Sequence, residues 1–600
     1  MKKIWNKYVK KALAMTLIAA MLIQVLPATV KGAELDTTTF EEPEAELQTG
    51  LSDIYEYETY DVGKAGTISV NTYSGYPHIR RTDMTLGGER MPVEIAFYYD
   101  YNNETAFNPY GTGWSCIYNQ LLIYNSSEER YEYKNENGTW LYFVNSGEQN
   151  EDGEEIWTED TAYGIRDTGS EMYLSAEAEE EDYTKAKVIY DGKTHVFDSL
   201  GRLVQISDEY NSITIAYVDE TEKIDYIVDP VGRTFLFFYT AGYLNAIYAT
   251  NKDGERIDYT EIVYRMANGA LRGVIYGYKE HNEYLYAGNR ITTIIDIDGN
   301  GYELAYSKGK VSSVIQKAAI GTSEEEEGAI VTYEYLEDSQ TIITSDGSST
   351  YYTFDEWGRT IGCELQQISE DATEYITVYG YNMTYDYLEN EDGSITNALI
   401  DVEYYDENGV IEEDSSDEDV EEEEAFEESD TETETGSEVE EEYETLYDEY
   451  GNVTAEIHSA DGLRQETRYA YSSDGNYLLM ERDSNFSTRR YLYDTDAGLL
   501  TATYDAKACK TNYTYDALRE LSSASINVSG LKAIDAEAAE IQLTDGASAM
   551  NVSYAYESGR LSAITYGDSV YAFTYDKWGN LLTVTMDDTT LVTYAYGEKA

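Results

Sequence analysis

The stretch "FTYDKWGNLLTVT" (residues 573–585) contains an aromatic–Asp pair, a gap of two residues, a glycine, an asparagine and then an apolar run. The pattern returns in "HVFDSLGRLVQI" (195–206), "YTFDEWGRTIGCE" (352–364) and "LYDEYGNVTAEI" (446–457), and less regularly in "YLYDTDAGLLTAT" (491–503) and "YTYDALRELSSAS" (513–525). A pattern that returns this often indicates a structural repeat, which must be explained before any single residue is given a chemical role.

Each copy of the repeat predicts a β-hairpin. An Asp at the first position of a four-residue turn accepts hydrogen bonds from the backbone ahead, and a Gly at the fourth position takes a left-handed conformation at little steric cost. The predicted turn residues are Asp198, Gly201, Asp229, Gly232, Asp355, Gly358, Asp448, Gly451, Asp494, Asp516, Asp576 and Gly579. We expect these carboxylates to form turns and not to act as catalytic acids, because they recur with the turns instead of converging as a pair.

The repeat also predicts the fold class. One hairpin cannot bury its apolar face alone, so consecutive hairpins must pair side by side, and a long twisted sheet then curls. The chain holds 62 Tyr against 12 Phe, with 45 Gly and only 6 Pro. Tyr favours half-buried strands, because its ring packs while its hydroxyl reaches water or a partner. The sequence therefore predicts an all-β fold of consecutive antiparallel β-hairpins in a spiralled, curved sheet, which forms a partial or complete shell.

The N-terminus has the features of a secretory signal peptide. Five lysines lie between positions 2 and 11, and residues 12–26 form an apolar stretch that is short for a membrane span. Pro27 ends the stretch, and small residues follow it up to Ala33. We expect residues 1–33 to be a signal peptide and the protein to be secreted or associated with the cell wall. An uncleaved N-terminal anchor is the alternative.

The rest of the chain divides by composition into a tether, two β-rich regions, an insertion and a final β-rich region. The predicted segments are an acidic tether (34–62), a β-rich lead-in with early repeats (63–321), a charged loop (322–328), a repeat sheet (329–411), an acidic insertion (412–444) and a continuing repeat sheet (445–600). About 20 of the 33 residues of the insertion are acidic and none is basic, which predicts a disordered, self-repelling segment. Residues 531–543 carry helical spacing and predict a short helix or a long loop between hairpins. The final sheet stops in mid-pattern at residue 600.

Charge and cysteine content exclude several classes of partner and site. The formal net charge is −75, so nucleic acid and anionic lipid are poor partners. Cys116, Cys363 and Cys509 are far apart, odd in number and without a Cys-x-x-Cys pair, so neither a disulfide scaffold nor a structural zinc site is supported. A single disulfide between two of them stays open.

No catalytic constellation is visible in the sequence. His78, His195, His281 and His458 are scattered, and no Gly-x-Ser-x-Gly surrounds a serine. Asp296, Asp298 and Asn300 match the opening of a calcium loop, but Ser307 stands where a bidentate Glu is needed. A hairpin turn is therefore favoured over a calcium site at that position. We expect no enzyme activity and no cofactor.

The repeat unit resembles the YD repeat of Rhs-type proteins and of the teneurin-like shell. The stretches "GTISVNTYSGYPHIRRTDMTLGGERMPVEIAFYYDYNN" (66–103) and "FNPYGTGWSCIYNQ" (107–120) resemble the Rhs lead-in region. The resemblance covers about residues 63–600 apart from the acidic insertion. It implies a hollow shell of spiralled hairpins, which in many relatives encloses a C-terminal toxin used between competing cells.

The chain departs from that family pattern at its C-terminal end. It carries no clear Rhs core signature there and no toxin domain after one. "DPVGRT" (229–234) is superficially similar to the family's self-cleavage junction, but it lies early and leads straight into a strand. We interpret it as another turn, because Asp and Gly occupy the first and fourth positions.

The function expected from these features is that of a secreted, non-enzymatic shell or scaffold. It would encapsulate or present a toxin or effector in cell–cell interaction, with the cargo beyond residue 600 or on a separate chain. The alternative is a carbohydrate-binding cell-surface adhesin whose exposed Tyr rings stack on cell-wall glycans. A hydrolase on a β-scaffold is the least supported class. We expect neither nucleic-acid binding nor membrane association after signal cleavage.

Overall fold

The computed structural model describes most of the chain between residues 50 and 596. The described ranges are 50–52, 54–101, 108–160, 169–175, 182–277, 280–336, 339–345, 347–368, 375–389, 395–406, 409–410, 442–460, 463–507, 509–528, 550–557 and 560–596. The predicted signal peptide, the possible helix at 531–543, and most of the predicted tether and acidic insertion lie outside these residues. The described residues form strands and two 3₁₀ turns, η1 (Gly63–Ala65) and η4 (Tyr183–Lys185). No helix among them is long and apolar enough to cross a lipid bilayer.

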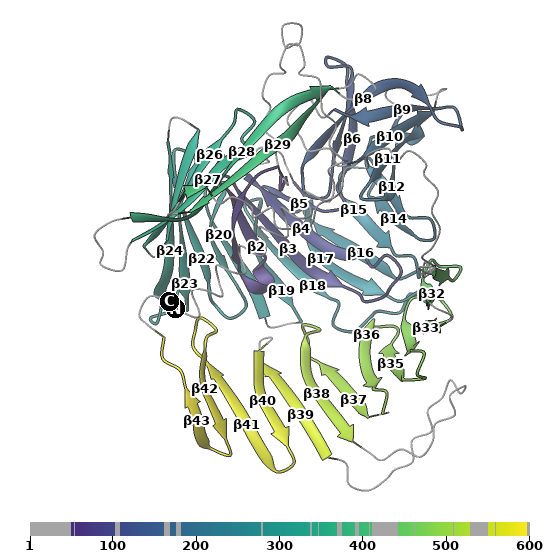
Figure 1. Cartoon of the computed structure of the whole chain (residues 1–600), viewed down its shortest axis with the longest axis vertical. Coiled ribbons are helices and arrows are strands. Elements are labelled where there is room, and N and C mark those ends of the chain that lie inside the picture. The colour runs from purple at the N-terminus through teal and green to yellow at the C-terminus, as the bar shows by residue number, and fades with distance from the viewer. Residues whose placement is uncertain are drawn as a thin grey trace, which may run out of the picture.

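The strands form three antiparallel sheets, in which the neighbours are consecutive in the chain (Figure 1). The first sheet consists of β1 (Tyr57–Asp61), β2 (Thr67–Asn71), β3 (Pro77–Thr85), β4 (Glu94–Asp100) and β5 (Trp114–Cys116).

The second sheet consists of β6 (Leu121–Asn125), β7 (Arg130–Lys134), β8 (Trp140–Gln149), β9 (Glu154–Glu159), β10 (Glu171–Ser175), β11 (Ala186–Tyr190), β12 (Lys193–Phe197), β13 (Leu203–Ser207), β14 (Ser212–Tyr217), β15 (Ile224–Val228), β16 (Thr234–Thr240), β17 (Tyr243–Thr250), β18 (Ile262–Ala267), β19 (Ala270–Tyr276), β20 (Glu280–Ala287), β21 (Arg290–Ile295), β22 (Gly301–Ser307), β23 (Lys310–Ala318), β24 (Glu326–Tyr335), β25 (Gln340–Ser345), β26 (Ser348–Phe354), β27 (Thr360–Ile368), β28 (Tyr375–Glu389), β29 (Ile395–Asp406) and β30 (Gly409–Val410).

The third sheet consists of β31 (Glu442–Tyr447), β32 (Val453–Ala460), β33 (Leu463–Tyr471), β34 (Leu478–Arg482), β35 (Thr488–Asp494), β36 (Leu499–Tyr504), β37 (Lys510–Tyr515), β38 (Leu521–Val528), β39 (Met550–Glu557), β40 (Arg560–Tyr566), β41 (Ser569–Tyr575), β42 (Leu581–Met586) and β43 (Thr589–Thr593). The predicted fold class, all-β with consecutive antiparallel hairpins, is confirmed.

Most of the repeat turns share one geometry, which Asp576 illustrates. Its Oδ1 accepts the N–H of Trp578 at 2.9 Å and that of Asn580 at 2.8 Å, while Gly579 N–H donates to the Asp576 carbonyl at 3.0 Å. Gly579 has φ +82°, in the left-handed region where a Cβ would be strained. The Asp therefore accepts backbone hydrogen bonds and the Gly takes a left-handed conformation, as the sequence predicts.

The residue after the glycine also belongs to the turn. Asn580 Nδ2 donates to Asp576 Oδ2 at 3.0 Å, so the second carboxylate oxygen is used as well. Arg202, Arg233 and Arg359 occupy the same position and donate through Nε to Asp198, Asp229 and Asp355 at 2.8, 2.6 and 2.7 Å. The requirement for a donor that reaches back to the Asp explains why Arg or Asn follows the glycine.

In several hairpins a tyrosine hydroxyl links the hairpin to the one before it. The register shifts between Thr574 and Tyr575, next to the turn, as it does beside most of the repeat turns. Such a bulge disrupts the ladder locally. The hydroxyl of the strand-end Tyr donates to a carbonyl at the start of a preceding strand in Tyr239–Ile224 (2.9 Å), Tyr306–Ile291 (2.7 Å), Tyr335–Val311 (2.9 Å), Tyr471–Val453 (3.1 Å), Tyr515–Leu500 (2.8 Å), Tyr575–Leu561 (2.8 Å) and Tyr596–Leu581 (2.8 Å). Phe cannot make this bond, which accounts for Tyr at these strand ends.

The first sheet lies within the curve of the second sheet and shares its hydrophobic core (Figure 1). Arg81 on β3 pairs with Asp83 at 2.6 Å, and both side chains are fully buried. Tyr264 and Tyr276 of the second sheet donate to the two carboxylate oxygens of Asp83 at 2.7 and 2.8 Å. The guanidinium lies 4.6 Å from the ring centre of Trp114. The buried ion pair thus has the additional partners that such a pair needs.

Three of the predicted segment boundaries differ from the structure. Residues 57–61 of the predicted tether form β1, which pairs with β2. Residues 322–325 of the predicted charged loop connect β23 to β24, whereas residues 326–328 belong to β24, where Glu327 forms an ion pair with Lys317 of β23 at 2.8 Å. Residues 442–444 of the predicted insertion belong to β31. An acidic run such as residues 324–327 predicts a loop when it is taken alone, but its cationic partner, Lys317, lies on the neighbouring strand.

Candidate functional site

The hairpin tips of the third sheet meet the other two sheets along one line, which we call the turn seam (Figure 1). On the third sheet the turn seam comprises Tyr450, Gly451, Asp474, Asn476, Tyr477, Gly498, Ala517, Glu520, Arg560, Lys577 and Trp578. On the other sheets it comprises Asp61, Lys64, Leu86, Gly87, Glu89, Arg90, Tyr210, Asn211, Arg233, Gly277, Asp296, Glu326 and Gly328. The turn seam joins the three sheets, and a cavity lies along it.

Arg90, between β3 and β4, holds one end of the turn seam. Its Nη1 donates to the Asp474 carbonyl at 2.8 Å and its Nε donates to Asn211 Oδ1 at 2.7 Å. The guanidinium also lies 4.3 Å from the ring centre of Tyr450, at the third position of a repeat turn. One side chain therefore connects all three sheets through charge-assisted hydrogen bonds and a cation–π contact.

Arg233 holds the middle of the turn seam. Its Nε donates to Asp229 Oδ2 at 2.6 Å, and its Nη1 donates to the Gly87 carbonyl at 2.9 Å and to the Tyr477 hydroxyl at 3.2 Å. The stretch "DPVGRT" is thus a turn, and its Arg joins the three sheets. A Cβ at Gly87 would lie 2.7 Å from the Gly498 carbonyl oxygen, so the backbones cross here without room for a side chain.

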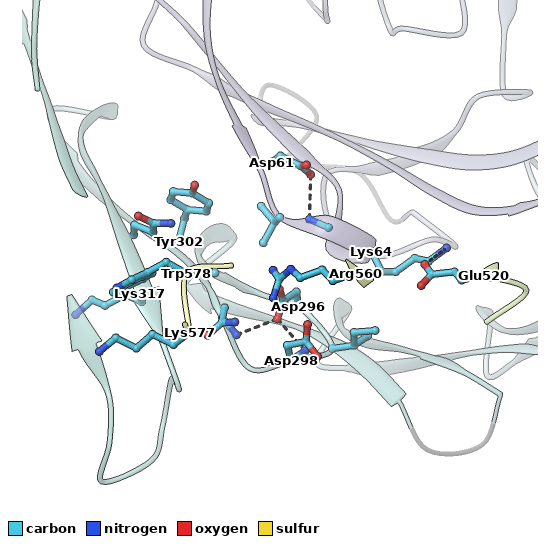
Figure 2. Close-up of a pocket in the computed structure, with 16 residues that line it drawn as sticks. Asp61, Lys64, Asp296, Asp298, Tyr302, Lys317, Glu520, Arg560, Lys577 and Trp578 are labelled. Carbon is cyan, nitrogen blue, oxygen red and sulfur yellow. Dashed lines mark hydrogen bonds and ion pairs between the residues drawn. The ribbon is translucent and has the colours of Figure 1, made fainter. Parts of the chain in front are cut away.

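A cavity of about 280 Å³ lies at the other end of the turn seam (Figure 2). It is lined by side chains from all three sheets. Lys64 pairs with Glu520 at 3.1 Å across the first and third sheets, and Lys577 pairs with Glu326 across the third and second. A Cβ at Gly328 would lie 2.9 Å from the Trp578 ring, so this ring sits directly on β24.

Asp296 lies in the centre of the cavity, between β21 and β22, with Arg560 beside it (Figure 2). Its Oδ1 accepts the N–H groups of Asp298 and Asn300, both at 2.9 Å. Burial, with a smaller contribution from the Asp298 charge, raises the pKa of Asp296 to about 6, and Arg560 opposes this shift. The structure therefore places Asp296, Asp298 and Asn300 in a hairpin turn. Within the described ranges, no group of three or more His, Cys, Asp or Glu side chains is arranged to hold a metal ion.

The other predicted turn residues occupy hairpin tips as well. Asp198, Asp229, Asp355 and Asp448 close four-residue turns with Gly201, Gly232, Gly358 and Gly451. At Asp516 the fourth position is Arg519, which takes φ +64° where the other copies use Gly. At Asp494 the turn is one residue longer and closes through Gly498 N–H at 2.8 Å. These two departures explain why the sequence pattern is blurred there.

The histidines and cysteines are not brought together. His78, His195, His281 and His458 lie on β3, β12, β20 and β32. Burial lowers the pKa of His78 and of His195 to about 4, so both rings are neutral at physiological pH. Cys116 and Cys509 are free thiols, Cys363 is buried on β27, and burial raises the pKa of Cys116 to about 12.

The turn seam was not predicted from the sequence. Its signal was the large aromatic residue at the third position of several repeat turns, as in Tyr450-Gly451 and Trp578-Gly579. A turn alone does not require a large ring at that position. A ring placed at a hairpin tip is available for contact with another part of the molecule, which is how Tyr450 and Trp578 are used.

No family model matches the chain, and no curated protein matches its sequence. Among solved structures, the chain is similar to the TcdB2-TccC3 crystal structure at 12% identity and a TM-score of 0.22, covering 94% of this chain and 29% of that chain. The Tc holotoxin pore of Photorhabdus luminescens matches at 12% identity and a TM-score of 0.19, covering 87% of this chain and 25% of that one. The N-terminal domain of SpvB from Salmonella typhimurium matches at 11% identity and a TM-score of 0.10, covering 54% and 99%. The chain spans less than a third of the length of the two Tc toxin chains.

Proposed function

We propose that this protein belongs to the Rhs/YD-repeat class and acts as a secreted, non-enzymatic β-shell that encloses or presents a polypeptide cargo, such as a toxin or effector. One observation carries the proposal: hairpin follows hairpin through the second and third sheets, and the third sheet is joined to the others at its tips. A wall of this kind surrounds space with few residues.

The chemistry of the wall also favours a scaffold. The repeat carboxylates are occupied by turn N–H groups and by the Arg or Asn that follows the glycine at Asp198, Asp229, Asp355, Asp448 and Asp576. A carboxylate with both oxygens held by the backbone and a cation is stabilised as a structural group. The net charge of −75 keeps such a large surface soluble outside the cell.

Protease protection of an unfolded polypeptide tests enclosure. The full chain is mixed with a fluorescent, permanently unfolded polypeptide, a protease is added, and the survival of the probe is measured over time. If the chain encloses polypeptides, a defined fragment of the probe persists far longer than it does with an equal mass of albumin. Degradation of the probe at the same rate in both samples would contradict the proposal.

Glycan binding is the second candidate function, and two exposed rings favour it. Tyr259 is 61% exposed, and Tyr443 is 72% exposed with its ring stacked on His458 at 4.4 Å. Exposed aromatic faces suit the apolar faces of sugars. An adhesin would be retained on a cell-wall glycan array, and the substitution Tyr443→Ser would reduce that retention. An array without signal would contradict glycan binding and leave the shell as the proposed function.

A further inference from the structure

Strands β37–β42 of the third sheet carry one continuous apolar face. Directly paired residues share a face of a sheet, so the pairing register identifies it. One cross-strand row runs over β37–β42 through Tyr513, Ala524, Tyr554, Ile564, Tyr571 and Met586. We call the face that contains this row the tyrosine face.

The opposite face of the same strands is small and mostly polar. Its cross-strand row consists of Asn512, Ser525, Ser553, Thr565 and Val570. Antiparallel sheets with this alternation normally pack the apolar face on a core and expose the other face to water. The alternation of residues in β37–β42 is therefore typical of a sheet whose apolar face, here the tyrosine face, packs against another part of a protein.

In the described part of the chain, the tyrosine face is only partly buried. Of its cross-strand row, only Ala524 is buried, and the large side chains remain partly exposed. No residue of β37–β42 belongs to the hydrophobic core that the first and second sheets share. A contiguous apolar face that stays partly exposed is a feature of interaction sites.

The charge around the tyrosine face indicates the occupant. The hairpin tips away from the turn seam carry the exposed Asp505, Asp568, Asp587 and Asp588. A second copy of the chain would bring another −75 to the same place, and repulsion between the copies opposes that pairing. A segment with positive charge would be attracted by the same rim.

The rings of this protein already accept cations. The Arg560 guanidinium lies 6.0 Å from the ring centre of Tyr575, on the tyrosine face itself. Arg130 and Arg359 lie closer to their rings, 3.8 Å from Tyr142 and 4.0 Å from Tyr385. Lys and Arg can lay their apolar stems on such rings while the charged head reaches a carboxylate.

We propose that the tyrosine face binds a segment of a separate polypeptide that combines Lys or Arg with apolar residues. Its apolar side chains cover the aromatic row, and its cations reach the aspartates at the distal hairpin tips. This inference rests on the proposed enclosure of a polypeptide and names the chemistry of the enclosed chain.

Peptide binding to the full chain tests the proposal. The probes are a fluorescent 20-residue peptide of Lys, Leu and Ser and two twins in which Glu or Ser replaces every Lys; fluorescence anisotropy is measured at low and high salt. We expect the Lys peptide to bind, the Glu twin not to bind, and binding to weaken with salt, as electrostatic attraction does. Equal binding of the Glu twin, or no binding of the Lys peptide, would overturn the proposal.

Variants place the binding on the tyrosine face. Tyr554→Ser with Tyr571→Ser should weaken binding of the Lys peptide about tenfold, the effect expected for losing two aromatic contacts. Tyr259→Ser is the matched control, because it removes an exposed ring elsewhere, and it should change nothing. Unchanged affinity in the double variant contradicts the proposal.

Two further measurements decide the matter if the double variant unfolds. Asp587→Lys with Asp588→Lys leaves the apolar row intact and should weaken binding of the Lys peptide and strengthen binding of the Glu twin. An unchanged preference for the Lys peptide contradicts the proposal.

Sedimentation of the chain alone tests the other occupant, a second copy of the chain. A dimer that the substitution Tyr571→Arg dissociates would assign the tyrosine face to that second copy. If unfolded probes of every charge are protected equally from protease, enclosure stands and this inference fails. If no probe is protected, both fail.

Discussion

The second and third sheets are built from the same hairpin but have different surroundings. In the second sheet, the cross-strand row of Phe237, Ile247, Ile262 and Tyr276 is at most 6% exposed, because the first sheet lies within its curve. In the third sheet, the row through Tyr554 and Tyr571 remains partly exposed, and the sheet is held at its tips. The repeat thus specifies the hairpin and its link to its neighbour, whereas burial of the apolar face depends on what lies against it. Since buried apolar area supplies most of the stabilisation, the two sheets should differ in stability.

The largest effect is expected at the buried ion pair that fixes the first sheet to the second. Arg81→Ala leaves the Asp83 carboxylate buried with two tyrosines and no cation, and should lower the free energy of unfolding by about 3–5 kcal/mol. Arg489→Ala, which removes an exposed pair with Glu481 within the third sheet, should cost less than about 1 kcal/mol. Denaturant titration of both variants measures the difference, and equal costs would show that the first sheet is not anchored in this way.

Matched truncations compare the two apolar faces directly. Ile247→Ala in the second sheet should cost about 2–5 kcal/mol, because the site is closed and leaves a cavity. Ile564→Ala on the tyrosine face should cost about 1 kcal/mol, because the side chain is already partly exposed. Thermal and chemical unfolding of both variants gives the two values. A cost at Ile564 as large as that at Ile247 would mean that the tyrosine face is covered.

The cavity at the turn seam predicts a pH dependence. The pKa of Asp296 is raised to about 6 from its ordinary 3.8, so the folded state binds this proton more tightly than the unfolded chain does. Its contribution to stability is fully present below about pH 4 and is lost as the pH rises through 6. Asn keeps the turn and removes the titration. The stability of Asp296→Asn relative to the natural chain should therefore rise between pH 4 and pH 7, and a pH-independent difference would contradict the assignment.

The smallest effect is expected at the tyrosine links between hairpins. Tyr575→Phe removes the hydroxyl that donates to the Leu561 carbonyl and should cost about 1 kcal/mol, the usual net value of one hydrogen bond. Tyr259→Phe removes an exposed hydroxyl and serves as the control. Hydrogen exchange of the β40–β41 amides should accelerate in the first variant alone. Unchanged exchange would show that the backbone hydrogen bonds between β40 and β41 hold the two hairpins together without the Tyr575 hydroxyl.

Local physics made the hairpins predictable from the sequence. The Asp and Gly of a repeat turn act within five residues, as at Asp576 and Gly579, so the sequence alone indicated their geometry. The role of the following Arg or Asn is equally local but was not predicted, because the turn pattern of Asp and Gly uses only one carboxylate oxygen. Arg233 could not have been assigned, since it contacts Gly87 and Tyr477, which lie 146 and 244 residues away in the chain. Which apolar face is covered is likewise a property of the assembled sheets and not of any one hairpin.

Hydrogen exchange of the full chain tests the comparison between the second and third sheets most directly. We expect the amides of β37–β42 to exchange together, with less protection than those of β15–β23, and to gain protection when the Lys peptide is added. Equal protection of the two sheets, with no change on adding the peptide, would contradict this expectation.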